Sequence, residues 1–431
     1  MSTVEQETKN RTRKLNQEKK EISTKPPGHK TICLPIGESE HKESIADPKA
    51  YRELIDRCYE NHPELFPTGM SEGYTLHDMR KASAKLPDVQ QRRIKLKSTE
   101  EAYTIRPSFV LPYMMGYTND VENGLLLLNH GVPYWLVTAV CGKDDMYWER
   151  LEISFGRNSL VGTTVNSSDI LPEDMSADEK HTKNNGEKVY IATTVAGECV
   201  LGASVSPSAG AKDLTSSYGQ FKTEALNVDP NYQPKTVNTD GWSSTINAWN
   251  TLFPTITTIL CFLHSFIKIR SCGKRLGDTY FELCDKVWAV YHAATETEHD
   301  ILMADLAIWA LHNLPDGPAL EATIKLCCRF DKFSLAYSFP NAHRTSNMVD
   351  RHMDPMNRYL FAGKYFHGHL MTAEFRIRGW ALIHNFRPFC PRSNPAKQGF
   401  QSRAHRLNGS VYHHHWLHNL LISSSMVGFR A

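Results

Sequence analysis

Three acidic segments of this chain have the residue types and the order needed to hold divalent metal ions. Asp178 lies in Met-Ser-Ala-Asp-Glu-Lys-His, Asp240 in Val-Asn-Thr-Asp-Gly-Trp, and Asp350 in Ser-Asn-Met-Val-Asp-Arg. Mg²⁺ prefers carboxylate and water oxygens to Cys or His ligands. Three acids that converge from distant sequence positions therefore indicate metal-assisted chemistry at a phosphate ester.

That chemistry has two requirements, an activated attacking oxygen and a stabilised leaving oxygen. Two Mg²⁺ (or Mn²⁺) ions roughly 4 Å apart meet both of them. In this arrangement Asp178 and Asp240 would lie on adjacent strands, with Asp178 bridging both ions. Asp350 would close the site from a helix, so these three residues are the candidate catalytic and metal-binding set.

The residues after Asp240 carry a family resemblance. The Asp-Gly pair is followed by a helix that reaches Leu252-Phe253-Pro254 and by a strand that runs into Cys261-Phe-Leu-His264. This pattern resembles the Mutator-like and hAT-type DDE transposases, and the chain as a whole looks like the transposase of a bacterial insertion sequence. The resemblance covers roughly residues 169–391. It implies an RNase H-like core in which Asp240 is the second catalytic carboxylate and the Cys-x-x-His motif opens a helical insertion.

The last acid departs from the family pattern. The segment Ser346-Asn347-x-x-Asp350 resembles the Ser/Thr-Asn-x-x-Glu signature, but it has Asp where Glu is usual. Either the site uses three Asp residues, or Glu374 is the third acid and Asp350 is incidental. The sequence context around Asn347 and Arg351 favours Asp350.

Each motif taken alone also has a simpler interpretation. An Asp-Gly pair is commonly a turn, Asp178 with Glu179 fits a solvated strand edge, and Asp350 fits a charge at a helix N-terminus. Cys261 and His264 make half of a zinc site, but no second pair follows at suitable spacing. We therefore interpret them as structural or substrate-positioning residues.

The elements around the acids predict a layered α/β domain over residues 170–431. A β-rich hairpin is split by Ala196-Gly197, helical patterns alternate with two further strands, and helical periodicity without a strand marks an all-α insertion at about 265–340. The expected strands are 175–181, 188–195, 198–206, 236–239 and 257–261, and the expected helices are 211–227 and 243–252.

The N-terminal sequence predicts two further regions. Residues 1–40 form a disordered basic arm, since the first 30 contain almost no apolar residues. Residues 45–165 form a mainly helical DNA-binding region. Within it, helices at 132–141 and 144–155 would be joined at Gly142-Lys143, which is helix-turn-helix spacing. A plain helical hairpin has the same spacing and remains the alternative.

Charge is unevenly distributed along the chain. From residue 341 to the end there are 12 Lys and Arg against three acids, a net charge of +9, so the first 340 residues carry −7. A basic segment rich in His and aromatic residues suits a polyanion, and Arg351 and Arg358 are the expected DNA contacts. A solvated surface is the alternative.

Composition also bears on location and partners. The most apolar run, residues 251–269, contains Pro254 and Lys268 and makes a poor membrane span. The ten Cys follow no disulfide-like spacing, and no segment resembles a secretory signal. We therefore expect a cytoplasmic, nucleoid-associated protein that acts as a homodimer on transposon-end and target DNA. The alternatives are a domesticated DNA-binding protein that has lost cutting and a metal-dependent nuclease without strand transfer.

Overall fold

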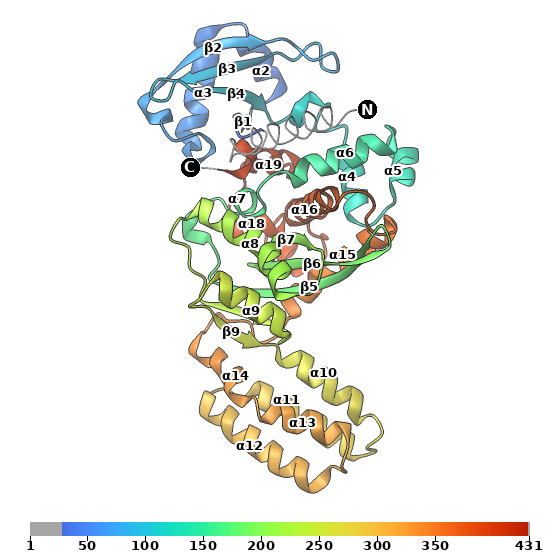
Figure 1. Cartoon of the computed structure of the whole chain (residues 1–431). Helices are drawn as coiled ribbons and strands as arrows, with labels where there is room; N and C mark the ends of the chain where they lie inside the picture. Colours follow the sequence, from blue (N-terminus) through green and yellow to red (C-terminus); the bar gives the residue numbers. More distant parts are fainter. Residues whose placement is uncertain (1–27, 430–431) are drawn as a thin grey trace, which may run out of the picture.

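The computed structural model describes residues 28–429 and has three parts (Figure 1). A four-stranded sheet contains the first strands of the chain, a five-stranded sheet with helices on both faces lies in the middle, and a helical lobe projects from the far end. The expected α/β character with a mixed sheet flanked by helices is confirmed.

The central sheet has the strand order β7-β6-β5-β8-β9. β5 pairs antiparallel with β6, and β6 with β7, whereas β8 lies parallel to both β5 and β9. The turn between β6 and β7 places Gly197 and Glu198 at positive φ (54° and 62°), which a tight two-residue hairpin requires. The strands are β5 (Asp174–Asn184), β6 (Glu187–Ala196), β7 (Cys199–Ser206), β8 (Thr236–Thr239) and β9 (Thr257–Leu260).

Helices cover both faces of this sheet because apolar side chains along its strands point alternately to one face and to the other. On β6, Ile191 and Val195 join one core with residues of α15 (Asn347–Ala362) and α16 (Leu370–Phe386). Ala192 and Ala196 join the opposite core with residues of α8 (Ala211–Val228) and α9 (Ser243–Leu252). Residues two apart on a strand share a face, so the position of each acid along its strand decides which helices it meets.

The helical lobe follows β9 directly and has an apolar core of its own, to which Leu283, Val287 and Leu306 contribute. From residue 262 to 338 the chain is helical or in turns, with no strand. The lobe consists of α10 (Phe262–Gly273), α11 (Thr279–His292), α12 (Glu296–Asn313), α13 (Pro318–Cys327) and α14 (Phe330–Ser334).

The N-terminal region differs from its prediction. The expectation of a mainly helical segment over 45–165 is wrong for residues 74–107, which form three strands of a sheet ordered β1-β4-β3-β2. On β3 the buried apolar residues Ile94 and Leu96 alternate with half-buried basic residues, which hide that period in the sequence. The elements are β1 (Thr31–Leu34), α2 (Glu38–Ser44), α3 (Pro48–Asn61), β2 (Tyr74–Arg80), β3 (Gln91–Leu96) and β4 (Ala102–Pro107).

The predicted disordered arm, residues 1–40, is also too long. Residues 1–27 lie outside the described part of the chain, but residues 31–34 form β1, which pairs in parallel with β4 and is almost entirely buried. The run Thr-Ile-Cys-Leu explains the difference, because apolar and β-branched residues stabilise a buried strand.

The two helices with helix-turn-helix spacing are present as α5 (Tyr134–Cys141) and α6 (Asp145–Gly156). Asp144 caps α6 by accepting a hydrogen bond from the Tyr147 amide (2.7 Å). Trp148, Leu151 and Phe155 of α6 are fully buried, and α6 packs on α16. Two short helices flank this pair, α4 (Glu122–Asn129) and α7 (Leu160–Thr164).

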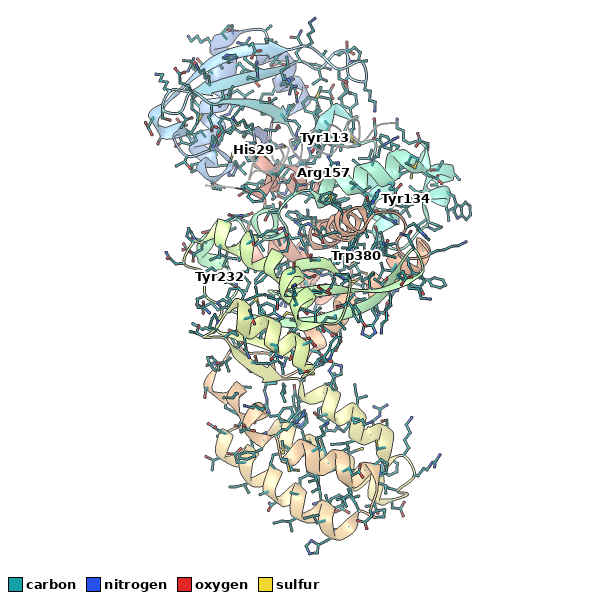
Figure 2. The ribbon with its side chains drawn as sticks, viewed as in Figure 1. His29, Tyr113, Tyr134, Arg157, Tyr232 and Trp380 are labelled. Atoms are coloured by element: carbon teal, nitrogen blue, oxygen red, sulfur yellow. The ribbon has the colours of Figure 1, made fainter. Side chains whose placement is uncertain are left out.

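The C-terminal helices connect the first sheet to the central one. Every residue of α19 (Trp416–Ser423) is buried, and the helix contacts β1, α7 and α16. The apolar run 416–427 therefore packs on its own chain. Nearby, Arg157 lies over the ring of Tyr113, 5.9 Å from its centroid (Figure 2). The remaining helices are α17 (Asn394–Lys397) and α18 (Arg403–Asn408), and no helix within residues 28–429 is long and apolar enough to cross a membrane.

Candidate active site

Asp178 and Asp240 lie at the same level of two neighbouring parallel strands, Asp178 within β5 and Asp240 directly after the last residue of β8. The register of β5 and β8 pairs Ser176 with Asn238, and the two Asp residues each follow two positions later. Because side chains two apart share a face, Asp178 and Asp240 extend the same polar row. This is the face on which α15 packs against β5 and β6.

Asp178 is mostly buried, and its environment disfavours its negative charge. One carboxylate oxygen accepts a hydrogen bond from the Glu179 amide (2.8 Å). Burial is the largest influence and raises the pKa of Asp178 to about 6, with further contributions from the charges of Asp240 and Asp350. The Glu179 hydrogen bond and the charge of His264 oppose this shift. Asp240 and Asp350 therefore both lie within electrostatic reach of Asp178.

Asp240 stands at the turn between β8 and α9 with its side chain exposed. One carboxylate oxygen accepts a hydrogen bond from the Trp242 amide (2.8 Å), and Gly241 adopts a φ of +90°. The positive φ explains the glycine, because other residues are strained there. The Asp-Gly pair is thus a turn, and the second carboxylate oxygen of Asp240 stays available for a ligand.

Asp350 lies in the first turn of α15, where Ser346 fixes it. The Ser346 hydroxyl donates to the Asp350 carboxylate (2.7 Å). Ser346 is itself bound to Cys261, which accepts a hydrogen bond from the Ser346 amide (3.1 Å) and donates its thiol to the Ser346 hydroxyl (3.3 Å). The start of α15 is therefore tied to the end of β9, which directly follows β8 in the sheet.

Cys261 and His264 form a polarised pair beside the carboxylates. Burial raises the pKa of the Cys261 thiol, but hydrogen bonds from His264 and Ser346 outweigh burial and lower it overall. The hydrogen bond to Cys261 is the main reason why the pKa of His264 rises to about 9, and the charges of Asp350 and Asp178 add to the shift. The motif thus places a cationic imidazole near the candidate site.

Glu374, the alternative third acid, lies elsewhere. Its carboxylate accepts hydrogen bonds from the Ser204 hydroxyl (3.0 Å) and the Val205 amide (3.3 Å), both on β7. β7 is an edge strand of the sheet, and β6 separates it from β5. The structure therefore groups Asp350, rather than Glu374, with Asp178 and Asp240.

Glu179 is a buried acid whose environment differs from that of Asp178, although the sequence places the two side by side. It points to the opposite face of β5, where its carboxylate accepts hydrogen bonds from the hydroxyls of Tyr218 (2.6 Å) and Thr245 (2.7 Å). Burial is the main cause that raises its pKa to about 7. The two-residue period of a strand is the signal that distinguishes the two acids.

The oxygen donors fit Mg²⁺, but they do not form a complete cage. Within residues 28–429, no group of three or more His, Cys, Asp or Glu side chains is close enough to hold a metal ion. On the same polar row, the Ser176 hydroxyl and the Asn238 amide are buried and have no hydrogen-bond partner in the described part of the chain. Mg²⁺ commonly binds through one or two carboxylates, water and substrate phosphates, so an all-oxygen site that is completed by substrate suits it.

The two arginines expected to contact DNA lie on α15, seven residues apart. Both side chains are exposed, and Arg358 forms an ion pair with Asp354 (3.0 Å). Residues seven apart on a helix fall close to the same side. Arg351 therefore projects from the helix that carries Asp350, on a neighbouring face.

Comparison with known proteins adds no assignment. No protein-family model matches the sequence, and no curated protein matches it significantly.

Proposed function

We propose that this chain is a transposase of the DDE class, with Asp178, Asp240 and Asp350 as its catalytic carboxylates on an RNase H-like core. The observation that carries the proposal is the convergence of three acids, Asp178 within β5, Asp240 directly after β8 and Asp350 in the first turn of α15. The element order strand-strand-strand-helix-strand-helix-strand in a mixed sheet also supports this core.

The carboxylates are the residues that would hold two Mg²⁺ or Mn²⁺ ions. When bound, such ions activate the attacking oxygen and neutralise charge on the leaving oxygen of a phosphodiester. Asp178 would provide its carboxylate from the middle of β5, Asp240 from the turn that follows β8, and Asp350 from the first turn of α15. Ser346 is a positioning residue, because it orients the Asp350 carboxylate.

His264 and the basic C-terminal segment bear on substrate binding. A cationic imidazole beside the acids offers a phosphate a partner at the reacting centre. The exposed Arg351 and Arg358 add charge along α15. Transposon-end and target DNA are the substrates of this proposal, a homodimer on DNA is its working form, and the bacterial nucleoid is its place of action.

The test is a cleavage and joining assay with the full-length chain. Labelled duplexes that carry the sequences flanking the gene on either side would be incubated with Mg²⁺ or Mn²⁺, using Asp240→Asn as the matched inactive variant. Cleavage followed by joining to a second DNA supports the proposal. Metal-dependent cleavage without joining would instead identify a nuclease, and binding without any cleavage would identify a DNA-binding protein that has lost cutting.

A further inference from the structure

A basic cavity of about 860 Å³ lies against α15 on a different face from Asp350. Its walls come from the turn after β6, the start of α15, the segment that follows α16, and α18. The charged and imidazole side chains lining it are Glu198, His343, Arg344, Arg351, His352, Arg403 and Arg406. Asp350 is not among the lining residues, so this cavity is separate from the candidate active site.

Positive charge in the cavity exceeds negative charge by a wide margin. Four arginines line it, and Glu198 is the only carboxylate among the described lining residues. Glu198 already pairs with Arg406 (2.6 Å). Within residues 28–429 the other three arginines therefore face the cavity without a carboxylate partner. Partly buried charges without partners are costly unless a counter-ion is supplied.

Two of the three remaining guanidinium groups, those of Arg403 and Arg344, are oriented but not neutralised. Arg403 donates to the backbone carbonyl of His384 (3.3 Å) and lies over the ring of Phe389 (5.3 Å). Arg344 lies over the rings of Tyr291 (5.0 Å) and Tyr337 (4.6 Å). Aromatic contacts hold a guanidinium plane in place and leave its N–H donors free for an anion.

Arg351, the third of these arginines, has no orienting contact among the described residues. Its side chain is exposed at the rim, and within residues 28–429 it has no hydrogen-bond or ion-pair partner. Arg387, at the end of α16, also lies in a positive environment. Burial, with added repulsion from Arg403 and Arg358, lowers the pKa of its guanidinium to about 10. Several cations thus act on the same region from different elements.

We propose that this cavity binds a phosphodiester group of a DNA strand through Arg344, Arg351 and Arg403. A guanidinium binds phosphate oxygens in a bidentate fashion, which matches three unneutralised arginines, two of them held by aromatic contacts. The volume exceeds what one phosphate needs, so the attached sugar and base fit as well. This inference deepens the proposed function and depends on it for the identity of the strand.

The distance between the cavity and Asp350 indicates how far the bound phosphate would lie from the bond that is cut. One helix, about 10–12 Å in diameter with its side chains, separates the cavity from Asp350. Successive nucleotides of a strand advance about 3.4 Å along the duplex axis. A phosphate held in the cavity would therefore belong to a nucleotide only a few positions from the scissile bond, and the arginines would set which bond reaches the carboxylates.

The experiment measures binding of a single-stranded oligonucleotide to the full-length chain at several salt concentrations, without divalent metal ions. Arg351→Gln is the main variant, because its exposed side chain makes loss of folding a minor risk, and Arg344→Gln is the second. We expect each to weaken binding about tenfold and to reduce the slope of log affinity against log salt by about 0.7. Arg270→Gln, an equal change of charge at an exposed position of α10, should leave the slope unchanged.

Competition with inorganic phosphate distinguishes the two sources of this anion. Weak competition by phosphate, together with a lower slope for Arg351→Gln, supports a DNA strand. Tight phosphate binding that Arg351→Gln abolishes, with oligonucleotide binding unchanged, would overturn the DNA assignment in favour of a free phosphate compound. If Arg351→Gln and Arg344→Gln both keep the wild-type slope of log affinity against log salt, the cavity is not a binding site for the oligonucleotide.

Failure of this inference and failure of the proposed function give different results. A chain that binds the oligonucleotide through the cavity but never cuts DNA retains the cavity site and loses the transposase assignment. A chain that cuts and joins DNA, with unchanged binding in Arg351→Gln and Arg344→Gln, retains the transposase assignment and loses the cavity site.

Discussion

The Ser346 hydroxyl donates a 2.7 Å hydrogen bond to the Asp350 carboxylate, and the thiol of Cys261 donates to the same hydroxyl at 3.3 Å. This chain of contacts joins the end of β9 to the first turn of α15. It gives the Cys-x-x-His motif a physical role, because Cys261 fixes the serine that fixes the third acid.

Removing one carboxylate charge should abolish DNA cleavage. We expect Asp178→Asn, Asp240→Asn and Asp350→Asn each to lower the cleavage rate by roughly 10³-fold or more, because ligands that act as one unit fail together. Binding of the DNA ends should be largely retained, as a mobility-shift titration would reveal. Asp174→Asn is the control, since Asp174 precedes Asp178 on the same strand and pairs with the Thr236 hydroxyl (2.6 Å). An Asp240→Asn variant with full activity would contradict the catalytic assignment.

Glu374 provides a separate test of the third ligand. Its carboxylate is held by β7, so Glu374→Gln should keep cleavage close to the wild-type rate, with a modest loss of stability of about 1 kcal/mol from the weakened hydrogen bonds. Cleavage rates and thermal unfolding of Glu374→Gln and Asp350→Asn would be compared side by side. An inactive, folded Glu374→Gln beside an active Asp350→Asn would reverse our choice.

The sequence predicted the central strands well and the first sheet poorly, for a physical reason. β8 and α9 have their predicted bounds, Thr236–Thr239 and Ser243–Leu252, since a Gly or a Pro soon after each segment ends it. By contrast, β3 carries Arg92, Arg93 and Lys95 beside its buried apolar residues, and that charge conceals a strand. Sequence also could not place Glu374, because only the packing of α16 on β7 brings its carboxylate to Ser204 and Val205.

The raised pKa of Asp178 predicts a stability that depends on pH and metal. A carboxyl whose pKa rises from 3.8 to about 6 on folding stabilises the apo protein below about pH 3.8, and this contribution is lost as the pH rises through 6. Asp178→Asn should therefore raise the stability of the metal-free protein at pH 7.5 by an amount on the order of 2 kcal/mol. Thermal unfolding with and without EDTA measures it.

Mg²⁺ supplies the matching control for that prediction. It should stabilise the wild-type protein at pH 7.5 and have much less effect at pH 5, because protonated Asp178 binds metal weakly. The Asp178→Asn variant should respond little to Mg²⁺ at either pH. A wild-type protein whose melting temperature ignores Mg²⁺ at pH 7.5, with and without DNA, would count against metal binding at these acids.

Ser346→Ala should separate positioning from ligation. The hydroxyl touches Asp350 but is not itself one of the proposed ligands, so we expect a higher Mg²⁺ concentration for half-maximal cleavage, with activity largely restored at saturating metal. Stability should fall by about 1 kcal/mol from the lost hydrogen bond. Ser346→Thr retains the hydroxyl and is the conservative control. Equal metal dependence in wild type and Ser346→Ala would show that the serine has only a structural role.

Assembly is the last prediction. Joining two transposon ends to one target needs two active sites, and one chain has one set of three acids, so the active form should be at least a dimer on DNA. The helical lobe offers a surface, because Ile301, Ile308 and Leu311 of α12 are 57%, 58% and 63% exposed and lie on one side of the helix. We expect Ile308→Asp with Leu311→Asp to prevent dimerisation on paired ends and to abolish joining, as measured by native mass spectrometry and the joining assay. Ile267→Asp, at a 50% exposed position of α10, is the control and should assemble normally. A wild-type monomer that joins ends at any dilution would disprove the dimer.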